Sequence, residues 1–519
     1  MSFVKSLDHG ARRYPDRVCL QMGDEKLTYR ALQALSYRIG NKLKAIGLGR
    51  GDHAAVLATN DITAFCCVFG FHRAGVTWVP ANPKLNPDDI QYQFDFFDCK
   101  VVIYQKAFAP MIDSLRAALP KVEAFVCLDA DLPNAPSLES WLEGTSDELL
   151  EVLVDPEDLS LVMPTGGTTG RSKGVSLTNR NINTFVATCL YIFGYEHSVT
   201  PISLAAAPLT HATGLMSLHV MARGGRIIIL TKADPAEMVD VIEKERVTEF
   251  FLPPTVIYRM LDLPGVADRD FSSLHYFVYA AAPISVEKLR QAIKIFGPCM
   301  AQMFGQAEAP GVCTYLSPKD HFEEDGSLGG EDRLSSCGYP TPLVDIKILN
   351  DDNVEVATGE RGEICVRGDL VMKGYYKKPD ITAQTIIDGW LHTGDIGFKD
   401  TDGRVHICDR KKDMIISGGF NIYPQEIEQV IWSHPAVQDC AVIGVPDDDW
   451  GEAVKVVVEL NSGMKVTEAE LLALCKKELG SLRTPKSVDF LDVLPRSPNG
   501  KVLKREIRQS YWVGRDRQI

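Results

Sequence analysis

The hydrophobic pattern near the start of the chain alternates between helix and strand spacing. Over residues 28–47, apolar side chains recur at the intervals that place them on one face of a helix, namely Leu32, Leu35, Ile39, Leu43 and Ile46. A Gly-Asp turn at 51–52 precedes a short apolar run at 53–58, a helical stretch at 61–74 and another short run at 76–79. The pattern predicts that helices and strands follow one another from the start.

The same alternation continues as far as residue 296. Short apolar runs predict strands at 101–104, 124–128, 159–163, 202–207, 226–230, 249–252 and 276–280. Helices are predicted from a cap at Thr178 or Asn179 to residue 190, at 235–246 and at 285–296. Strands that alternate with helices indicate an α/β fold of mostly parallel sheets covered by helices.

The pattern changes near Cys337, where short alternating runs at 344–349 and 363–367 indicate antiparallel strands. A charge run at 409–413 lies between two apolar strands, and taken alone it is a solvated turn. Beyond it, helices at 424–433 and 468–479 and strands at 441–445, 454–460 and 488–491 form a mixed unit. We place the domain boundary there, which gives a large domain at 1–410 and a small one at 411–519.

Composition limits the class of protein. The 519 residues are 45% hydrophobic and 24% charged, which suits a globular chain of more than one domain. A net charge of −14 disfavours nucleic acid as a partner. The 13 cysteines are scattered without a Cys-x-x-Cys pair, which fits a reducing compartment. No signal peptide or spanning apolar segment is visible, so we expect a cytoplasmic protein.

A glycine-rich loop at 164–175 follows the predicted strand at 159–163. Glycines let several backbone N–H groups turn toward one point, threonine hydroxyls add donors, and Arg171 and Lys173 add charge, so the loop suits phosphates. It is not a Walker A loop, because Gly174 follows Lys173 where that motif has Ser or Thr. The alternative interpretation is a surface hairpin without a ligand.

The loop resembles the signature of the adenylate-forming superfamily, in its acyl-CoA synthetase and 4-coumarate–CoA ligase branch. Residues 165–174 match, although Gly166 and Ser172 stand where serine and proline are common. The resemblance covers essentially the whole chain. It implies a large domain with a small barrel-like part, followed by a small mobile α+β domain. It assigns nucleotide contacts to Thr165, Gly166, Gly167, Thr168, Thr169, Gly170 and Lys173.

Further motifs of the resemblance lie in the second half of the chain. Phe304 and Gly305 match residues beside adenine, and Glu308, with Thr168, matches the Mg²⁺ site. Ala307 stands where the family usually has threonine, so one phosphate contact is missing. Asp395 and Arg410 match the ribose contacts. Taken alone, Glu308 is an ordinary helix first-turn acid and Asp395 an ordinary turn residue.

The last motifs concern movement and catalysis. Lys412 matches the family's hinge, and Ser417, Gly418 and Gly419 match the glycine turn that approaches the pantetheine arm of coenzyme A. Lys501 matches the lysine that stabilises charge when a carboxylate attacks the α-phosphate. The resemblance thus gives catalytic roles to Lys501, Lys173, Glu308 and His211. A lone histidine such as His211 is more often a packed core residue.

The implied reaction joins a carboxylic acid to coenzyme A at the expense of ATP, through an acyl-adenylate. By alignment the acyl pocket contains His211, Thr213, Ala280, Ala281 and Met303. The absence of an acidic residue from 209 to 219 argues against amino acids, so we expect an apolar fatty or aryl monocarboxylic acid. Alternatives are an amine or carrier protein as acceptor, a luciferase-like oxygenase, or a non-catalytic adenylate sensor. We expect a monomer or homodimer.

Overall fold

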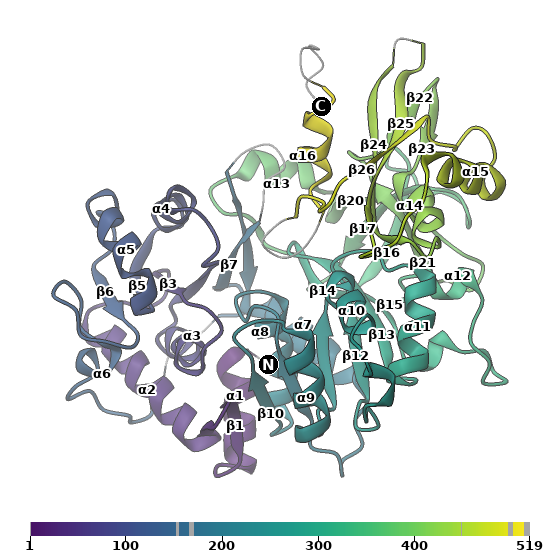
Figure 1. The fold of residues 1–519 in the computed structure, drawn as a ribbon. Coiled ribbons are helices and arrows are strands. Elements are labelled where there is room, and N and C mark those ends of the chain that lie inside the picture. The colour runs from purple at the N-terminus through teal and green to yellow at the C-terminus, as the bar shows by residue number, and fades with distance from the viewer. Residues whose placement is uncertain (1, 152–154, 166–170, 448, 497–501, 513–519) are drawn as a thin grey trace.

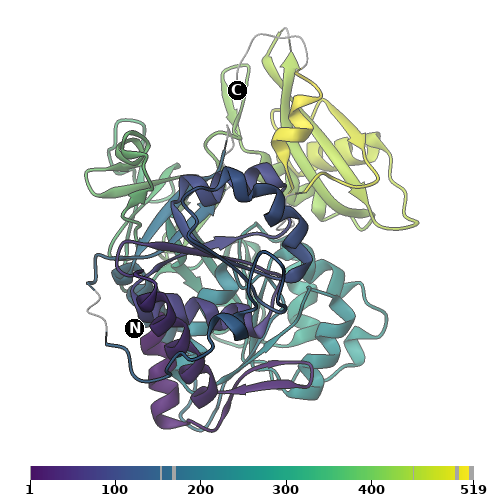
Figure 2. The same cartoon turned by 90° about the vertical axis from the view of Figure 1, so that its left-hand side faces the viewer.

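A computed structural model describes residues 2–151, 155–165, 171–447, 449–496 and 502–512. Figure 1 shows a large body built from the N-terminal three quarters of the chain, with a smaller C-terminal body at one end of it. Figure 2, seen at right angles, shows the same separation. No helix of these described ranges is long and apolar enough to cross a membrane.

The first sheet of the large body has the strand order β18-β8-β7-β4-β3-β5-β6. Its strands are β3 (His53–Leu57), β4 (Thr77–Ala81), β5 (Cys99–Tyr104), β6 (Ala124–Cys127), β7 (Leu159–Thr165), β8 (Lys173–Thr178) and β18 (Gly374–Tyr375). The strands from β7 to β6 are parallel, whereas β8 pairs antiparallel with β7 and with β18. The two strands that flank the glycine loop therefore form a hairpin.

The second sheet has the order β15-β14-β13-β12-β11-β9-β10-β1-β2, and its strands from β13 to β1 are parallel. Its strands are β1 (Val18–Met22), β2 (Glu25–Thr28), β9 (Ile202–Ala205), β10 (Arg226–Ile229), β11 (Glu249–Leu252), β12 (Tyr276–Tyr279), β13 (Met300–Gln306), β14 (Ala309–Leu316) and β15 (Tyr339–Pro340). The predicted α/β architecture of mostly parallel sheets is confirmed.

Helices cover both faces of both sheets. Along β3, Ala54 and Val56 join the core between the sheets while Ala55 and Leu57 join an outer core, as the two-residue period of a strand requires. The helices of the central core are α1 (Phe3–Arg13), α2 (Tyr29–Ala45), α3 (Ile62–Ala74), α6 (Leu138–Trp141), α7 (Asn179–Ile192) and α8 (Ala212–Ala222). The outer helices are α4 (Pro87–Phe96) and α5 (Ala109–Leu115) on one side, and α9 (Pro235–Glu245), α10 (Pro254–Leu261), α11 (Val286–Phe296) and α12 (Glu331–Leu334) on the other.

A smaller antiparallel sheet follows, in the part for which the resemblance implied a barrel-like body. Its strands are β16 (Asp345–Leu349), β17 (Gly362–Arg367), β19 (Ile386–Ile387), β20 (Trp390–Lys399) and β21 (Val405–Arg410), with α13 (Pro379–Thr385) beside it. The order is β16-β17-β20-β19, and β21 also pairs with β20. The chain leaves this sheet at Arg410, the residue at which we predicted the domain boundary.

The C-terminal body is a mixed sheet with helices on it. Its elements are β22 (Ile415–Ser417), β23 (Phe420–Ile422), α14 (Pro424–Trp432), β24 (Val437–Asp447), β25 (Gly451–Leu460), α15 (Glu468–Leu479), β26 (Ser487–Phe490) and α16 (Lys504–Gln509). Ile427, Ile431 and Leu471 pack on one face of the sheet, and Ile507 packs on the other. The α+β character predicted for this part is confirmed.

Candidate active site

The glycine loop begins and ends at residues that face each other. Thr165, the last residue of β7, pairs with Lys173, the first residue of β8, and the Thr165 hydroxyl donates to the Lys173 carbonyl at 3.4 Å. The predicted contacts Gly166, Gly167, Thr168, Thr169 and Gly170 lie outside the described residues, as does Lys501. The structure therefore describes the two ends of the predicted phosphate loop.

A tyrosine joins Lys173 to Glu308. Tyr375 lies on β18, directly opposite Val175 of β8, and the Lys173 ammonium lies 4.9 Å from the centre of its ring. The Tyr375 hydroxyl donates to Glu308 Oε1 at 2.7 Å. Burial, together with the Glu308 charge, raises the pKa of Tyr375, so the tyrosine remains a donor. The structure thus brings the predicted Lys173 and Glu308 together through a residue that sequence analysis missed.

Glu308 lies in the tight turn between β13 and β14. Phe304 and Gly305 belong to β13 itself, because the strand continues to Gln306. Gly305 allows the close approach of β14, since a Cβ there would lie 2.5 Å from the Gly311 nitrogen. The Phe304 side chain is largely buried. The turn presents a carboxylate, the hard oxygen ligand that Mg²⁺ prefers.

Asp395 and Arg410 form an ion pair across neighbouring strands. They are directly opposite on β20 and β21, and Arg410 Nε lies 2.7 Å from Asp395 Oδ1. The sequence suggested a turn at Asp395, but β20 runs straight through it with an irregular register, and Gly394 takes a positive φ of 71°. The Thr393 carbonyl accepts from Arg410 at 3.3 Å and from Gln306 at 3.4 Å. Because Gln306 ends β13, this pair lies beside the Glu308 turn.

The predicted acyl-pocket residues come from three segments. His211 and Thr213 lie at the start of α8, Ala280 and Ala281 follow β12, and Met303 is buried in β13. Ala281 has a φ of +73°, a left-handed conformation that alanine rarely adopts. Backbone strain of this kind gathers at ligand sites.

The hinge and glycine-turn residues lie in the C-terminal body. Lys412 is in the turn between β21 and β22, where burial, with the nearby charges of Arg410 and Arg508, lowers its pKa. Ser417 is buried on β22, and Gly418 and Gly419 form the turn to β23 with positive φ values of 57° and 82°. In Figure 1 this hairpin lies at the end of the small body that is remote from β7. The structure does not bring these three residues to Lys173 and Glu308.

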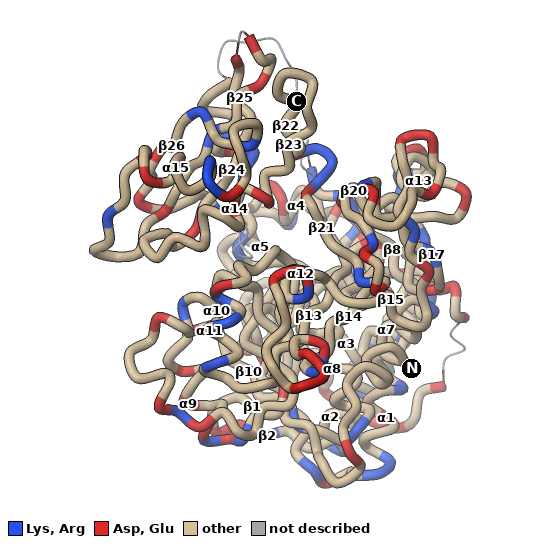
Figure 3. Tube along the Cα trace, turned by 90° about the vertical axis from the view of Figure 1, so that its right-hand side faces the viewer, with Lys and Arg blue, Asp and Glu red and all other residues tan. Residues whose placement is uncertain are grey.

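The surface charge is mixed. Figure 3 shows lysines and arginines interspersed with acidic residues over the side that it presents.

Comparison with known proteins identifies the family. A family model described as AMP-binding enzyme matches residues 7–376, and the model of its C-terminal domain matches residues 426–501. The chain belongs to the AMP-binding enzyme family. This is the adenylate-forming superfamily that the glycine loop and the later motifs resemble.

Full-length relatives support the acyl-CoA synthetase branch. The chain is 35% identical to a medium/long-chain-fatty-acid–CoA ligase, FadD8, of Mycobacterium tuberculosis, over 98% of this chain and 90% of the relative. It is 34% identical to a feruloyl-CoA synthase of an Amycolatopsis species, over 96% and 97% of the two chains. Among solved structures, the amide bond synthetase McbA of Marinactinospora thermotolerans matches with a TM-score of 0.88 at 27% identity, covering 98% of this chain and 100% of that one.

Proposed function

We propose that the protein is an ATP-dependent acid–CoA ligase that acts on an apolar monocarboxylic acid. The observation that carries the proposal is the Lys173–Tyr375–Glu308 group at the loop end of the β7–β8 hairpin, beside the Asp395–Arg410 pair. These groups come from distant parts of a chain that belongs to the AMP-binding enzyme family. Its relatives along nearly the full length include acid–CoA ligases.

The reaction has two halves. A carboxylate oxygen of the acid attacks the α-phosphorus of ATP, the bond to the bridging oxygen breaks, and pyrophosphate leaves with both electrons. The thiol of coenzyme A then attacks the carbonyl carbon of the acyl-adenylate, loses its proton, and expels AMP. Activation is needed because a carboxylate is a poor electrophile, whereas AMP is a good leaving group.

The described residues around the nucleotide each have a role in the first half. Lys173 places a positive charge beside the phosphates. Asp395 accepts hydrogen bonds from both ribose hydroxyls, while Arg410 forms an ion pair with the same carboxylate. Glu308 would hold Mg²⁺ through an oxygen, which neutralises phosphate charge when it is bound. Tyr375 fixes the rotamer of Glu308 through its hydrogen bond, and because the tyrosine is neutral it adds no second negative charge beside the carboxylate. Lys501 and Thr168 complete the set according to the resemblance.

The small domain serves the second half. We place its boundary after Arg410, with Lys412 in the connecting turn as the hinge. Turning about this point would carry the Gly418–Gly419 turn from its remote position to the carbonyl of the adenylate, where glycines allow the pantetheine arm to approach the backbone.

Of the alternative acceptors, an amine or a carrier protein, the amine has support from a solved structure. McbA is an amide bond synthetase of the same fold, so an amine in place of coenzyme A is the second candidate. The two relatives act, by their names, on a fatty acid and on an aryl acid, which supports an apolar acyl pocket around His211 and Met303.

The test is pyrophosphate release across a panel of fatty and aryl acids, with and without coenzyme A. The protein is compared with Lys501→Ala and with Lys465→Ala, which removes an exposed lysine as a matched control. We expect pyrophosphate from one class of acid, a thioester only with coenzyme A, and loss of both in Lys501→Ala alone. Pyrophosphate without thioester, but with an amide when amines are added, would favour the amide synthetase. ATP binding without turnover of any acid would favour a non-catalytic sensor.

A further inference from the structure

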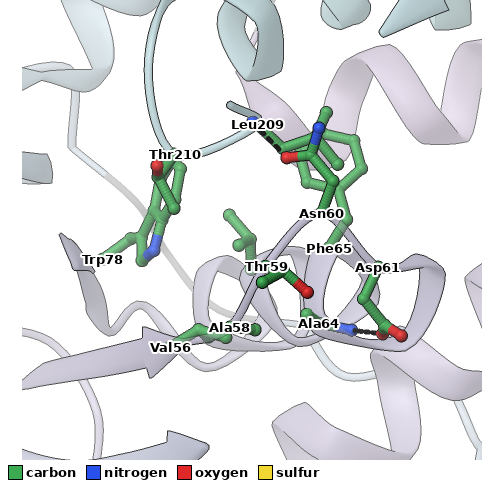
Figure 4. Close-up of a pocket in the computed structure, with 11 residues that line it drawn as sticks. Val56, Ala58, Thr59, Asn60, Asp61, Ala64, Phe65, Trp78, Leu209 and Thr210 are labelled. Atoms are coloured by element: carbon green, nitrogen blue, oxygen red, sulfur yellow. Dashed lines mark hydrogen bonds between the residues drawn. The ribbon is translucent and has the colours of Figure 1, made fainter. Parts of the chain in front are cut away.

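A small hollow lies where the carboxyl ends of the two sheets meet. Its lining comes from the end of β3, the start of α3, β4 and the segment after β9, as Figure 4 shows. The lining residues are Val56, Ala58, Thr59, Asn60, Asp61, Ala64, Phe65, Val68, Trp78, Leu209 and Thr210. Most of these side chains are apolar. The hollow has room for roughly one water-sized group beyond the surrounding atoms.

The hollow lies beside the points where each sheet reverses its strand order. In the first sheet, β4 and β5 lie on opposite sides of β3, and in the second sheet, β10 and β11 lie on opposite sides of β9. Ligands of open α/β sheets bind at the carboxyl ends of strands at such points. Asn60, after β3, donates to the Ala207 and Leu230 carbonyls at 3.1 and 2.9 Å, which ties the two points together.

Three of the polar lining residues are already engaged. Asn60 Oδ1 also accepts from the Leu209 backbone, at 2.9 Å. The Thr59 hydroxyl donates to Gln105 at 3.0 Å, and Asp61 caps α3 by accepting from the Ala64 backbone at 2.8 Å. These side chains shape the hollow and are held by the protein itself.

Two polar lining atoms have no hydrogen-bond partner among the described residues, the indole nitrogen of Trp78 and the hydroxyl of Thr210. Trp78 is almost fully buried, with 1% of its surface exposed. Figure 4 shows the two side chains together on one wall of the hollow. Burying such groups without a partner is costly, and an indole N–H can only donate. The missing partner is therefore an acceptor, which excludes an ammonium group.

The position of the hollow connects it to the acyl substrate. Thr210 immediately precedes His211, whose ring nitrogen Nδ1 lies 2.8 Å from the Thr210 carbonyl. Strands β7, β4 and β3 are adjacent, and neighbouring strands lie about 4.8 Å apart, so the hollow is about 10 Å along the sheet edge from Thr165, the end of β7. An acid whose carboxylate reaches the α-phosphate at the loop could extend its far end to β3.

We propose that the hollow binds an oxygen at the far end of the acid, about 10 Å from the carboxylate, through Trp78 and Thr210. The substrate class is thus an apolar acid with a remote hydroxyl, keto or ether oxygen. This inference rests on the proposed acid–CoA ligase function. The proposal makes Trp78 and Thr210 specificity-determining residues. They lie on β4 and after β9, away from the predicted acyl-pocket residues after β12 and on β13.

The test compares ω-hydroxyoctanoate with nonanoate, which has the same number of non-hydrogen atoms but ends in a methyl group. The quantity measured is the ratio of their kcat/KM values for pyrophosphate release. Thr210→Val keeps the side-chain shape and removes the hydroxyl, and Trp78→Phe removes the N–H. We expect each variant to lower the ratio by about tenfold, the value of one buried hydrogen bond. Thr188→Val, a buried threonine of α7 outside the hollow, is the control and should leave the ratio unchanged.

The outcomes separate this inference from the proposed function. If nonanoate reacts but neither Thr210→Val nor Trp78→Phe changes the ratio, the hollow holds only water, and this inference is wrong while the ligase function stands. If no acid of the panel releases pyrophosphate, both fall. Because Trp78→Phe alters a buried core position, Thr210→Val decides if the two variants disagree.

Discussion

A buried ion pair holds the last helix of the small domain in place. Lys504, the first residue of α16, lies 2.8 Å from Glu428 on α14, and the two side chains are 19% and 5% exposed. Glu428 Oε1 also accepts from the Val442 backbone of β24 at 2.7 Å. Although burial opposes the charge, Glu428 and Asp409 raise the pKa of Lys504, so the lysine stays protonated.

We predict that Lys504→Met destabilises the small domain by about 3–5 kcal/mol, because it removes the positive partner of a buried carboxyl. Burial already raises the pKa of Glu428 to about 7, so without Lys504 this carboxyl must take up a proton to stay buried. Glu428→Gln should cost about 3 kcal/mol through the converse effect, although glutamine still accepts from Val442. The double variant should cost less than either single change, since a neutral amide beside a thioether leaves no buried charge. Non-additivity of this size is expected only for groups in direct contact.

The assay is native-state hydrogen exchange of β24 and α16. A loss of about 3 kcal/mol should speed exchange there by about a hundredfold. Lys477→Met is the matched control, because it breaks an exposed pair with Glu478 and should change little. The reasoning is refuted if the double variant exchanges as fast as the sum of the two single effects predicts, or if Lys477→Met has as large an effect as Lys504→Met.

Three further predictions address the nucleotide site, the glycine turn and pH. Asp395→Asn should raise the KM for ATP by tenfold or more, measured by pyrophosphate release, and an unchanged KM would remove Asp395 from the ribose site. Gly418→Ala should slow thioester formation but not pyrophosphate release, because φ is +57° and the new Cβ would lie 2.3 Å from the Trp450 ring; equal losses in both steps would contradict this. Burial lowers the pKa of His321 to about 4, so near and below pH 6.5 the unfolded chain binds a proton that the folded chain does not. The free energy of unfolding should therefore fall by up to about 3 kcal/mol as the pH drops toward 4. His321→Gln should reduce that loss in urea denaturation, and an unchanged slope would exclude His321 as its source.

Local patterns predicted most of the α/β framework. The helix predicted at 28–47 is α2, which begins after a Thr28 cap, and the helical stretch predicted at 61–74 is α3, which Asp61 caps. The strand runs at 53–58 and 101–104 became β3 and β5 because buried parallel strands are short and continuously apolar. These elements are specified by residues close to them in the sequence.

The sequence did not predict elements and contacts that leave no pattern in the residues near them. Helix α8 is buried on all sides in the central core, so it has no polar face and no helical period to read. Tyr375 joins the site only because Gly374 and Tyr375 pair with Ser176 and Val175, nearly two hundred residues earlier in the chain. An aromatic residue after a glycine gives no indication that a distant strand will place it between a lysine and a glutamate.

The contacts between the two domains bear on the proposed thioester step. The small domain contacts the large one through α14, where Gln429 donates to the Ile284 carbonyl at 3.0 Å and Glu426 pairs with Arg361. The Gly418–Gly419 turn, which we propose meets coenzyme A, lies at the opposite end of the small domain from this contact. Polar contacts of this kind are weak enough to break, and the turn at Lys412 is where the chain crosses between the domains. We infer that thioester formation requires the Gln429 and Glu426 contacts to separate, and that strengthening them would favour pyrophosphate release at the expense of thioester.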